Sequence, residues 1–196
     1  MTRYLIVAVI ATNSLVLHTT LAVGGQGEPM SELEQSYLQK ATAGHQAEVA
    51  LGQLAVKKAS SNQVKQYGAR MIQDHQRVSK ELHKLTSKEG TPLPSGLSMP
   101  HQQIQRMLSQ LSGKDFDKAY ISFIVRDHMR ELGEWEQRAP TLTDPRLQHW
   151  TAGILPILND HLARGRAIAT TIGVNDEDLA RVEEATSPSQ PLVRTP

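Results

Sequence analysis

The sequence predicts an all-α fold, a ferritin-like four-helix bundle made of two repeated helical hairpins joined by a crossover that contains a short helix. Apolar residues recur every three or four positions over long stretches, and no segment shows the sustained alternation typical of strands. One sparse pattern also occurs twice, with an offset of 83 residues from Tyr37 to Tyr120 that becomes 86 from His75 to His161. The two copies are Tyr37, His45, Glu48, Val64, Tyr67, Asp74 and His75, then Tyr120, His128, Glu131, Leu147, Trp150, Asp160 and His161.

The chain divides into three predicted parts. Residues 1–24 have a basic start, a short apolar run and small residues before Gly25, which is typical of a signal peptide, with a retained tethering helix as the alternative. Residues 31–173 are the predicted bundle, and residues 174–196 a flexible tail, acidic and then rich in Ser and Pro. We therefore expect a periplasmic or secreted protein without a membrane span in its mature chain. With no cysteine, it has neither a lipid anchor on cysteine nor disulfides.

The first hairpin is predicted between residues 31 and 90. Ser31 and Glu34 form a capping-box pattern, so a helix of about seven turns is expected to start there and end near Ala59. The polar residues 60–62 supply a break and a new N-cap, and the second helix is expected to end at Gly90. Because the link is short, the two helices are expected to be antiparallel neighbours.

The second hairpin is predicted to follow a linker, 91–98, and a short crossover helix that Ser98 caps and that ends at Gly113. A third long helix is expected from Asp115 to Ala139. The fourth has Asp144 as its N-cap and ends at Gly173. Pro156 lies inside this helix and is expected to kink it, at the place where the second repeat holds three extra residues.

Polar side chains on the apolar helix faces are the candidate site. Imidazole and carboxylate groups together suit iron, zinc, manganese or copper, and bundle cores commonly hold such ions. Glu48 and His75 are expected to lie at the same level, whereas His128 and His161 differ by about five residues, a mismatch of several ångströms. A hydrogen-bonded polar layer without metal is the alternative. The candidate ligands are His45, Glu48, His75, His128, Glu131 and His161.

Asp precedes His three times, at Asp74, Asp127 and Asp160, more often than chance placement would give. Neighbouring helical residues point about 100° apart, so no Asp shares the face of its own His, and one interpretation is that each Asp orients the ring of a His from another helix. The favoured interpretation is a set of surface ion pairs, because Arg side chains stand three or four residues further on in each case. These arginines are Arg77, Arg130 and Arg164.

Other functions find little support. The net charge is +1, and no run of Lys or Arg is dense enough to follow a phosphate backbone, so nucleic acid binding is not expected. Phosphate-binding loops, serine nucleophile elbows and cysteine nucleophiles are absent from the sequence, and no catalytic residue is assigned. His83, His101 and His149 fall off the apolar faces and are expected at the surface.

Several short motifs together resemble those of the exported bacterial domain-of-unknown-function family 4142, whose members are often labelled outer membrane proteins. The motifs are residues 54–59, Met71 to His75, Ser112 to Tyr120, and Asp127 with His128. The resemblance covers about residues 36–169 and implies an exported ferritin-like domain without an assigned activity. Ferritins bind two irons through Glu-x-x-His motifs, whereas this chain has only His-x-x-Glu, so their ligand roles are not transferred.

The leading hypothesis is an exported, non-enzymatic helical bundle that binds a transition metal and has a stress-related or interaction role. A ferritin-like metal-dependent oxidoreductase is the first alternative. The second is a purely structural or protein-binding bundle, with the Leu-rich face of the crossover helix, Met99 to Ser112, as its contact surface. The identity of the metal, a protein partner and self-association all stay open at this point.

Overall fold

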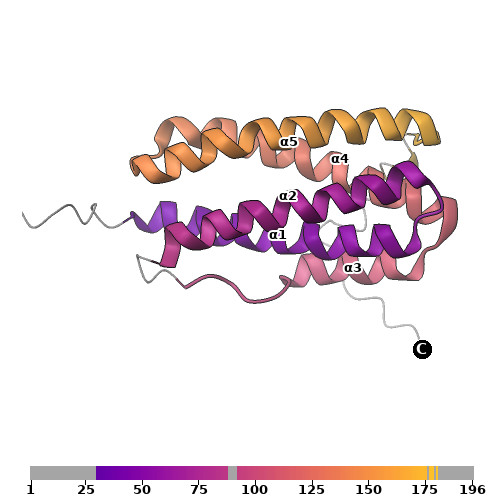
Figure 1. The fold of residues 1–196 in the computed structure, drawn as a ribbon, viewed down its shortest axis with the longest axis horizontal. Helices are drawn as coiled ribbons and strands as arrows, with labels where there is room; N and C mark the ends of the chain where they lie inside the picture. The colour runs from indigo at the N-terminus through magenta and orange to yellow at the C-terminus, as the bar shows by residue number, and fades with distance from the viewer. Residues whose placement is uncertain (1–29, 88–91, 176, 179, 181–196) are drawn as a thin grey trace, which may run out of the picture.

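A computed structural model describes residues 30–87, 92–175, 177–178 and 180. In these residues four long helices run along the long axis of the protein, and a short fifth helix lies beside α1 (Figure 1). This confirms the predicted all-α bundle, while its ferritin-like description stays a prediction. The predicted signal peptide, Gly90 and the tail beyond residue 180 lie outside the described residues. The helices are α1 (Glu32–Lys58), α2 (Asn62–Ser87), α3 (Met99–Gln110), α4 (Gly113–Arg138) and α5 (Pro145–Ile172).

The predicted helix ends are confirmed at most positions. Ser31 and Glu34 form both hydrogen bonds of a capping box, and the side chain of Asp144 accepts bonds from the first amides of α5. Gly173 ends α5 in the left-handed conformation, with φ of 70°. Helix α4 starts at Gly113, two residues before the predicted start, because its φ of 62° suits glycine and lets the chain turn into the helix directly after Ser112.

The two hairpins pack differently. In the first, α1 and α2 approach closely because Gly52 and Gly68 face each other: a Cβ on Gly52 would lie 2.8 Å from the Gly68 carbonyl oxygen. At the same offset of 83 residues, the second hairpin has Trp135 and Thr151 in these places. Trp135 is buried, and its ring lies 5.4 Å from that of Trp150. Large side chains therefore separate α4 from α5 where glycines join α1 to α2.

A buried carboxylate connects the hairpins at each end of the bundle. Glu34 on α1 accepts hydrogen bonds from the amides of Thr143 (2.8 Å) and Asp144 (2.9 Å), just before α5. Asp117 on α4 accepts bonds from the amides of Ser60 (3.0 Å) and Ser61 (2.9 Å), just before α2. Both acids and both pairs of amides are related by the offset of 83 residues. The sequence repeat is thus also a reciprocal set of contacts, and we call these two carboxylates the end clamps.

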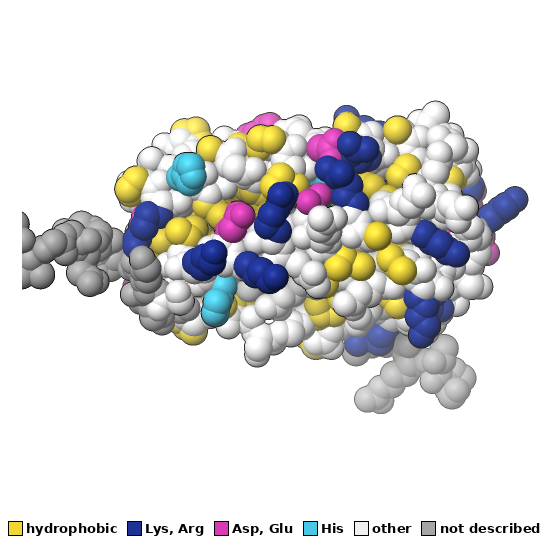
Figure 2. All heavy atoms as spheres, in the orientation of Figure 1, with side chains coloured by type: hydrophobic (Ala, Val, Ile, Leu, Met, Phe, Trp, Pro, Cys, Tyr) yellow, Lys and Arg dark blue, Asp and Glu magenta, His cyan; other side chains and the backbone are white. Residues whose placement is uncertain are grey.

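The crossover helix is part of the core. Ile104 and Leu108 on α3 are 3 % and 0 % exposed, so the apolar face of the crossover covers the bundle instead of facing solvent. The expectation that this face is a contact surface is therefore wrong, because the crossover needs its apolar residues to close the core between α1 and α4. On the face in Figure 2, Lys and Arg side chains are dispersed among acidic and apolar ones. None of the described helices is both long and apolar enough to cross a bilayer.

Candidate metal centre

Four histidines and one glutamate meet in the centre of the bundle. His45 and Glu48 come from α1, His75 from α2, His128 from α4 and His161 from α5. The histidines are 0 % exposed and Glu48 is 1 % exposed. Neighbouring rings lie 5.1 to 5.8 Å apart between centroids, from His45 through His75 to His128 and His161. All four long helices therefore contribute a polar side chain to a layer without access to water.

Glu48 is the carboxylate at the middle of this layer. Its Oε2 lies 2.8 Å from Nδ1 of His75 and 3.5 Å from Nδ1 of His45, and its Oε1 lies 3.4 Å from Nδ1 of His128. Burial alone would raise the pKa of Glu48, but the charges and hydrogen bonds of these histidines hold the pKa well below its usual value. Glu48 is therefore an ionised acceptor with His75 Nδ1 as its nearest donor, and the same Nδ1 lies 3.0 Å from Nδ1 of His45.

Three of the rings are oriented from outside by acceptors. His75 Nδ1 donates to Glu48, His128 Nδ1 lies 3.1 Å from the Ile124 carbonyl oxygen, and His161 Nε2 lies 3.0 Å from Oδ2 of Asp74. Carbonyl and carboxylate oxygens accept but do not donate, so the bonded nitrogen of each ring carries the proton. In a neutral imidazole the other nitrogen is then an unprotonated acceptor. This arrangement is the one that fixes histidine tautomers around metal ions.

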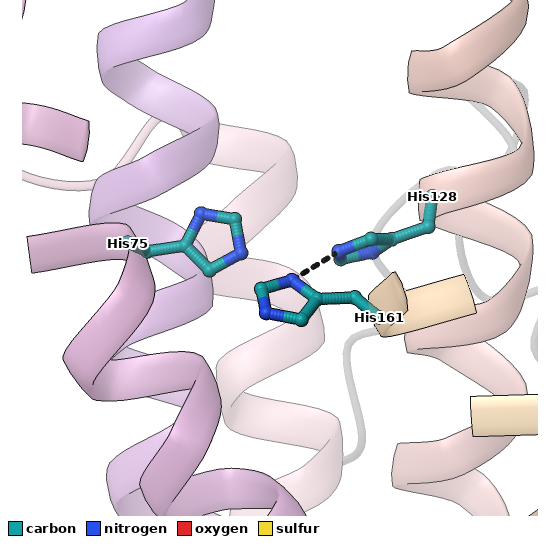
Figure 3. A group of neighbouring side chains, drawn as sticks. All are labelled: His75, His128 and His161. Atoms are coloured by element: carbon teal, nitrogen blue, oxygen red, sulfur yellow. Dashed lines mark hydrogen bonds between the residues drawn. The ribbon is translucent and has the colours of Figure 1, made fainter. Parts of the chain in front are cut away.

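The unprotonated nitrogens of these rings face one another, and we call His75, His128 and His161 the histidine triad (Figure 3). His128 Nε2 lies 3.3 Å from His161 Nδ1, and His75 Nε2 is buried without a hydrogen-bond partner. One nitrogen from each ring lies within 4.8 Å of the other two. Three unprotonated nitrogens therefore converge, because the proton of each ring is on the nitrogen that bonds to an acceptor outside the triad.

Protonation of His75 and His128 is opposed by burial. Desolvation lowers the pKa of His75 to about 4, although Glu48 acts in the opposite direction. It also lowers the pKa of His128, again against the attraction of Glu48. Both rings are therefore neutral near pH 7, which leaves their inner nitrogens with free lone pairs. Neutral imidazole is the form of histidine that binds metal ions.

The second repeat does not contribute its acids to the triad. Glu131 is half-buried, lines a surface pocket and is in none of the groups whose ligand atoms converge. Burial raises its pKa well above the usual value, and the nearby charges of Glu48 and Asp127 add to that shift. Asp160 forms ion pairs with Arg70 and Arg164 towards the surface. The carboxylate-rich ligand set of a ferritin di-iron centre is not assembled by these residues.

The three aspartates that precede histidines differ in their surroundings. All form the expected ion pairs, with Arg77, Arg130 and Arg164 respectively. Asp74 in addition bonds to His161 from across the bundle, the geometry expected of a residue that orients a ligand. Asp127 brings a carboxylate oxygen within 4.8 Å of the ligand atoms of Glu48 and His128, and burial raises its pKa. Asp160 has only the surface ion pairs among its described contacts.

The expected mismatch between His128 and His161 does not keep their rings apart. One reason lies in the connection, where a 3-10 turn, η1 (Ala139–Thr141), follows α4. A 3-10 turn rises about 2 Å per residue against 1.5 Å in an α-helix, so it carries the chain further along the axis before the chain reverses. The expected difference in level between His128 and His161 used the α-helical rise for every residue counted from Pro140, and it was therefore too large.

Two features could not be found from the apolar periodicity. His101, expected at the surface, is half-buried in the pocket next to Glu131, and its Nδ1 lies 2.9 Å from the Ser98 hydroxyl. The sequence does contain one signal for the end clamps Glu34 and Asp117. Both acids, and the residues whose amides they bind, recur at the repeat offset of 83 residues. The expected surface positions of His83 and His149 are confirmed.

Comparison with known proteins gives one result. The family model described as Domain of unknown function (DUF4142) matches residues 21–168, which is more than half of the chain. Neither the curated proteins nor the solved structures include a match.

Proposed function

The chain belongs to the family described as Domain of unknown function (DUF4142), and from that premise we propose that it binds one divalent transition-metal ion at the histidine triad. The observation that carries the proposal is the convergence of three buried acceptor nitrogens whose outer partners keep them unprotonated. A buried acceptor without a donor costs about 1–3 kcal/mol. A metal ion removes that cost at all three nitrogens together.

The spacing of the donors supports this proposal. Zinc binds histidine nitrogen at about 2.0–2.1 Å, so two nitrogens at tetrahedral angles lie about 3.3 Å apart. His128 Nε2 and His161 Nδ1 are separated by 3.3 Å. The third nitrogen, from His75, requires only a small side-chain movement, since all three lie within 4.8 Å. The second shell consists of Glu48, the Ile124 carbonyl and Asp74, the acceptors that such sites use.

Three neutral imidazoles suit zinc and copper better than magnesium or calcium, which prefer oxygen. Because the triad is 0 % exposed, a substrate of ordinary size has no access to the ion. Those two facts favour a role in holding or buffering a metal over a role in turnover. We propose that this role is carried out after export, as the predicted signal peptide suggests.

A hydrogen-bonded polar layer is the competing function, and one observation favours it. His128 Nε2 and His161 Nδ1 are also at a distance that a shared proton would give. In that case one ring is protonated in the native protein, and the layer serves only to set the register of the helices. The two functions differ in whether the purified protein gains stability from a metal.

The deciding experiment is metal analysis of the full chain purified after export, followed by titration of the chelator-treated protein with Zn²⁺, Cu²⁺, Mn²⁺ and Fe²⁺. We expect one ion per chain and an increase in unfolding free energy of about 2.7 kcal/mol at a free metal concentration of 100 Kd. His161→Gln should abolish both, while His149→Gln on the same helix should leave both unchanged because His149 is exposed.

A different result would overturn the proposal. If the chain unfolds at the same denaturant concentration with and without metal, and no metal copurifies, the hydrogen-bonded layer is the correct function. Circular dichroism of each variant shows that it is folded before binding is measured. If His161→Gln does not fold, Asp74→Asn replaces it, since that change keeps the three ligands and replaces the charged acceptor that orients His161 by a neutral amide.

A further inference from the structure

A surface pocket lies beside the triad, between α1 and α4. Its volume is about 60 Å³, enough for a hydrated ion but not for a large molecule. Both charged and aromatic side chains line it, and three of the acids are Asp127, Glu131 and Glu134. Its basic side chains are held by these acids: Lys40 and Arg138 pair with Glu134, and Arg130 pairs with Asp127. The pocket therefore holds three acids and three Lys or Arg side chains, and the acid it shares with the histidine layer is Asp127.

Asp127 belongs to this pocket and to the core at once. It lines the pocket, and one of its carboxylate oxygens lies within 4.8 Å of a Glu48 oxygen and of a His128 nitrogen. Glu48 Oε1 in turn is fully buried and has no hydrogen-bond donor. The oxygens of Asp127 and Glu48 thus form a short series of metal-compatible atoms beside the ring of His128, leading from the pocket towards the triad.

Burial of the triad makes such a route necessary. A divalent ion loses its hydration shell on the way to a site with 0 % exposure, and this loss is costly unless protein oxygens replace the water step by step. Hard and intermediate cations exchange water for carboxylate oxygen readily. The end clamps also hold both ends of the bundle closed, so a path along the bundle axis would require Glu34 or Asp117 to release its amides.

Resting on the function proposed above, we infer that this pocket is the port through which a divalent transition-metal ion reaches the histidine triad, with Asp127 and Glu48 as the carboxylates that pass it inward. The pocket thereby controls the rates of uptake and release, and the triad alone sets the affinity. A port of this kind changes both rates by the same factor when it is narrowed, because the ion enters and leaves by one path.

Gly44 allows the port to be narrowed without touching a ligand. It lines the pocket, and a Cβ built on it meets no atom within 4 Å. Gly44→Ala and Gly44→Leu therefore fill the opening by increasing amounts. Gly153 is the matched control, because it is also helical, its Cβ also meets no atom within 4 Å, and it lies outside the pocket. Gly153→Leu places the same side chain on α5.

The readout is intrinsic tryptophan fluorescence in a stopped-flow experiment with Cu²⁺ and the chelator-treated full chain. The ring of Trp150 lies 6.0 Å from that of His45, which in turn lies 5.1 Å from the ring of His75 in the triad, so we expect a copper ion bound there to quench the fluorescence of Trp150. We expect uptake and chelator-driven release to be slower by about tenfold in Gly44→Leu and less in Gly44→Ala, with Kd unchanged. Gly153→Leu should behave as the unaltered protein.

The outcomes separate this inference from the proposed function. If the unaltered chain binds no metal, the proposed function fails and the port fails with it. If the unaltered chain binds metal but Gly44→Leu leaves both rates unchanged, or alters Kd instead of the rates, only the port is overturned. Should Gly44→Leu not fold, the rates of Gly44→Ala against those of Gly153→Ala decide the matter in the same way.

Discussion

The first repeat turns its acids towards the histidines, whereas the second repeat turns the equivalent acids away. Glu48 and Asp74 contact the histidine layer, while Glu131 lines the pocket and Asp160 forms ion pairs near the surface. At the ends of the bundle the repeats are alike, because Glu34 and Asp117 bind equivalent amides. The comparison shows that two similar hairpins can keep a symmetric frame and still build an asymmetric centre.

Two differences in sequence accompany this asymmetry. Gly52 and Gly68 bring α1 close to α2, whereas Trp135 and Thr151 occupy the same places in the second hairpin. The second repeat also has three additional residues between Trp150 and Asp160. Three residues correspond to about 300° of helical rotation and 4.5 Å of rise, so residues beyond the insertion face a different neighbour. The centre therefore receives four histidines from both repeats, but of the repeated acids only Glu48 and Asp74 of the first.

The largest difference is expected between Glu48→Gln and Glu131→Gln. Glu48→Gln leaves the neutral His75 without its charged acceptor in a buried layer, a loss of about 1.5–3 kcal/mol in unfolding free energy. Glu131→Gln should change the unfolding free energy little, because Glu131 lines the surface pocket and burial beside Glu48 and Asp127 raises its pKa, which disfavours its charge in the folded protein. Urea unfolding with chelator present measures both, and equal losses would contradict the asymmetry.

The end clamps should respond alike, which tests the symmetric part of the comparison. Glu34→Gln and Asp117→Asn each weaken charge-assisted bonds to two amides, and each should cost about 1.5–3 kcal/mol. The double variant should lose the sum of both, because the clamps lie at opposite ends. A loss confined to one clamp in urea unfolding would show that the hairpins do not hold each other reciprocally.

The Glu34 clamp also predicts a dependence on acid. Burial opposes the shift, but hydrogen bonds from Asp144, Ser31 and Thr143 lower the pKa of Glu34 to about 2. Its contribution to stability is therefore complete above the unfolded pKa of about 4.3 and is lost as the pH falls towards 2. Glu34→Gln should lose less stability than the unaltered chain between pH 5 and pH 2, as measured by thermal unfolding at each pH.

The close approach in the first hairpin is tested by Gly52→Ala against Gly133→Ala. A Cβ on Gly52 would lie 2.8 Å from the Gly68 carbonyl oxygen and 2.9 Å from Cγ1 of Ile72, so α1 and α2 must move apart. Such overpacking costs about 1–3 kcal/mol. A Cβ on Gly133 in α4 meets nothing within 4 Å, and alanine there should stabilise the helix by about 0.5–1 kcal/mol. The sign of the change in melting temperature distinguishes the two.

The smallest change in stability is expected at the aspartates beside the histidines. Asp160→Asn removes exposed ion pairs, which are worth about 0–1 kcal/mol. Asp74→Asn removes the charge of the acceptor that orients His161 and should weaken metal affinity by about 10–100-fold, an effect that Asp160→Asn should not have. Titration of both variants with Zn²⁺ measures this, and equal affinities would place Asp74 among the surface ion pairs alone.

Much of the fold could be predicted from local patterns. The caps at Ser31, Asp144 and Gly173 depend on hydrogen bonds within a few residues, so the sequence around them is sufficient. The inward histidines could be predicted for a similar reason, since a position on an apolar helix face points to the core whichever helix lies opposite. The raised pKa of Glu131 and its place in the pocket could not, because they depend on residues from α1 and α3.

The sequence by itself determined the helices, the repeat and the histidines of the core, because periodicity and capping act within one helix. Only the tertiary structure decided which acids join those histidines and which nitrogen of each ring is left as an acceptor. The physical reason is that the direction and protonation of a buried side chain depend on its partners across the bundle. Those partners, such as Asp74 for His161, lie far away in the chain and are brought close only by packing.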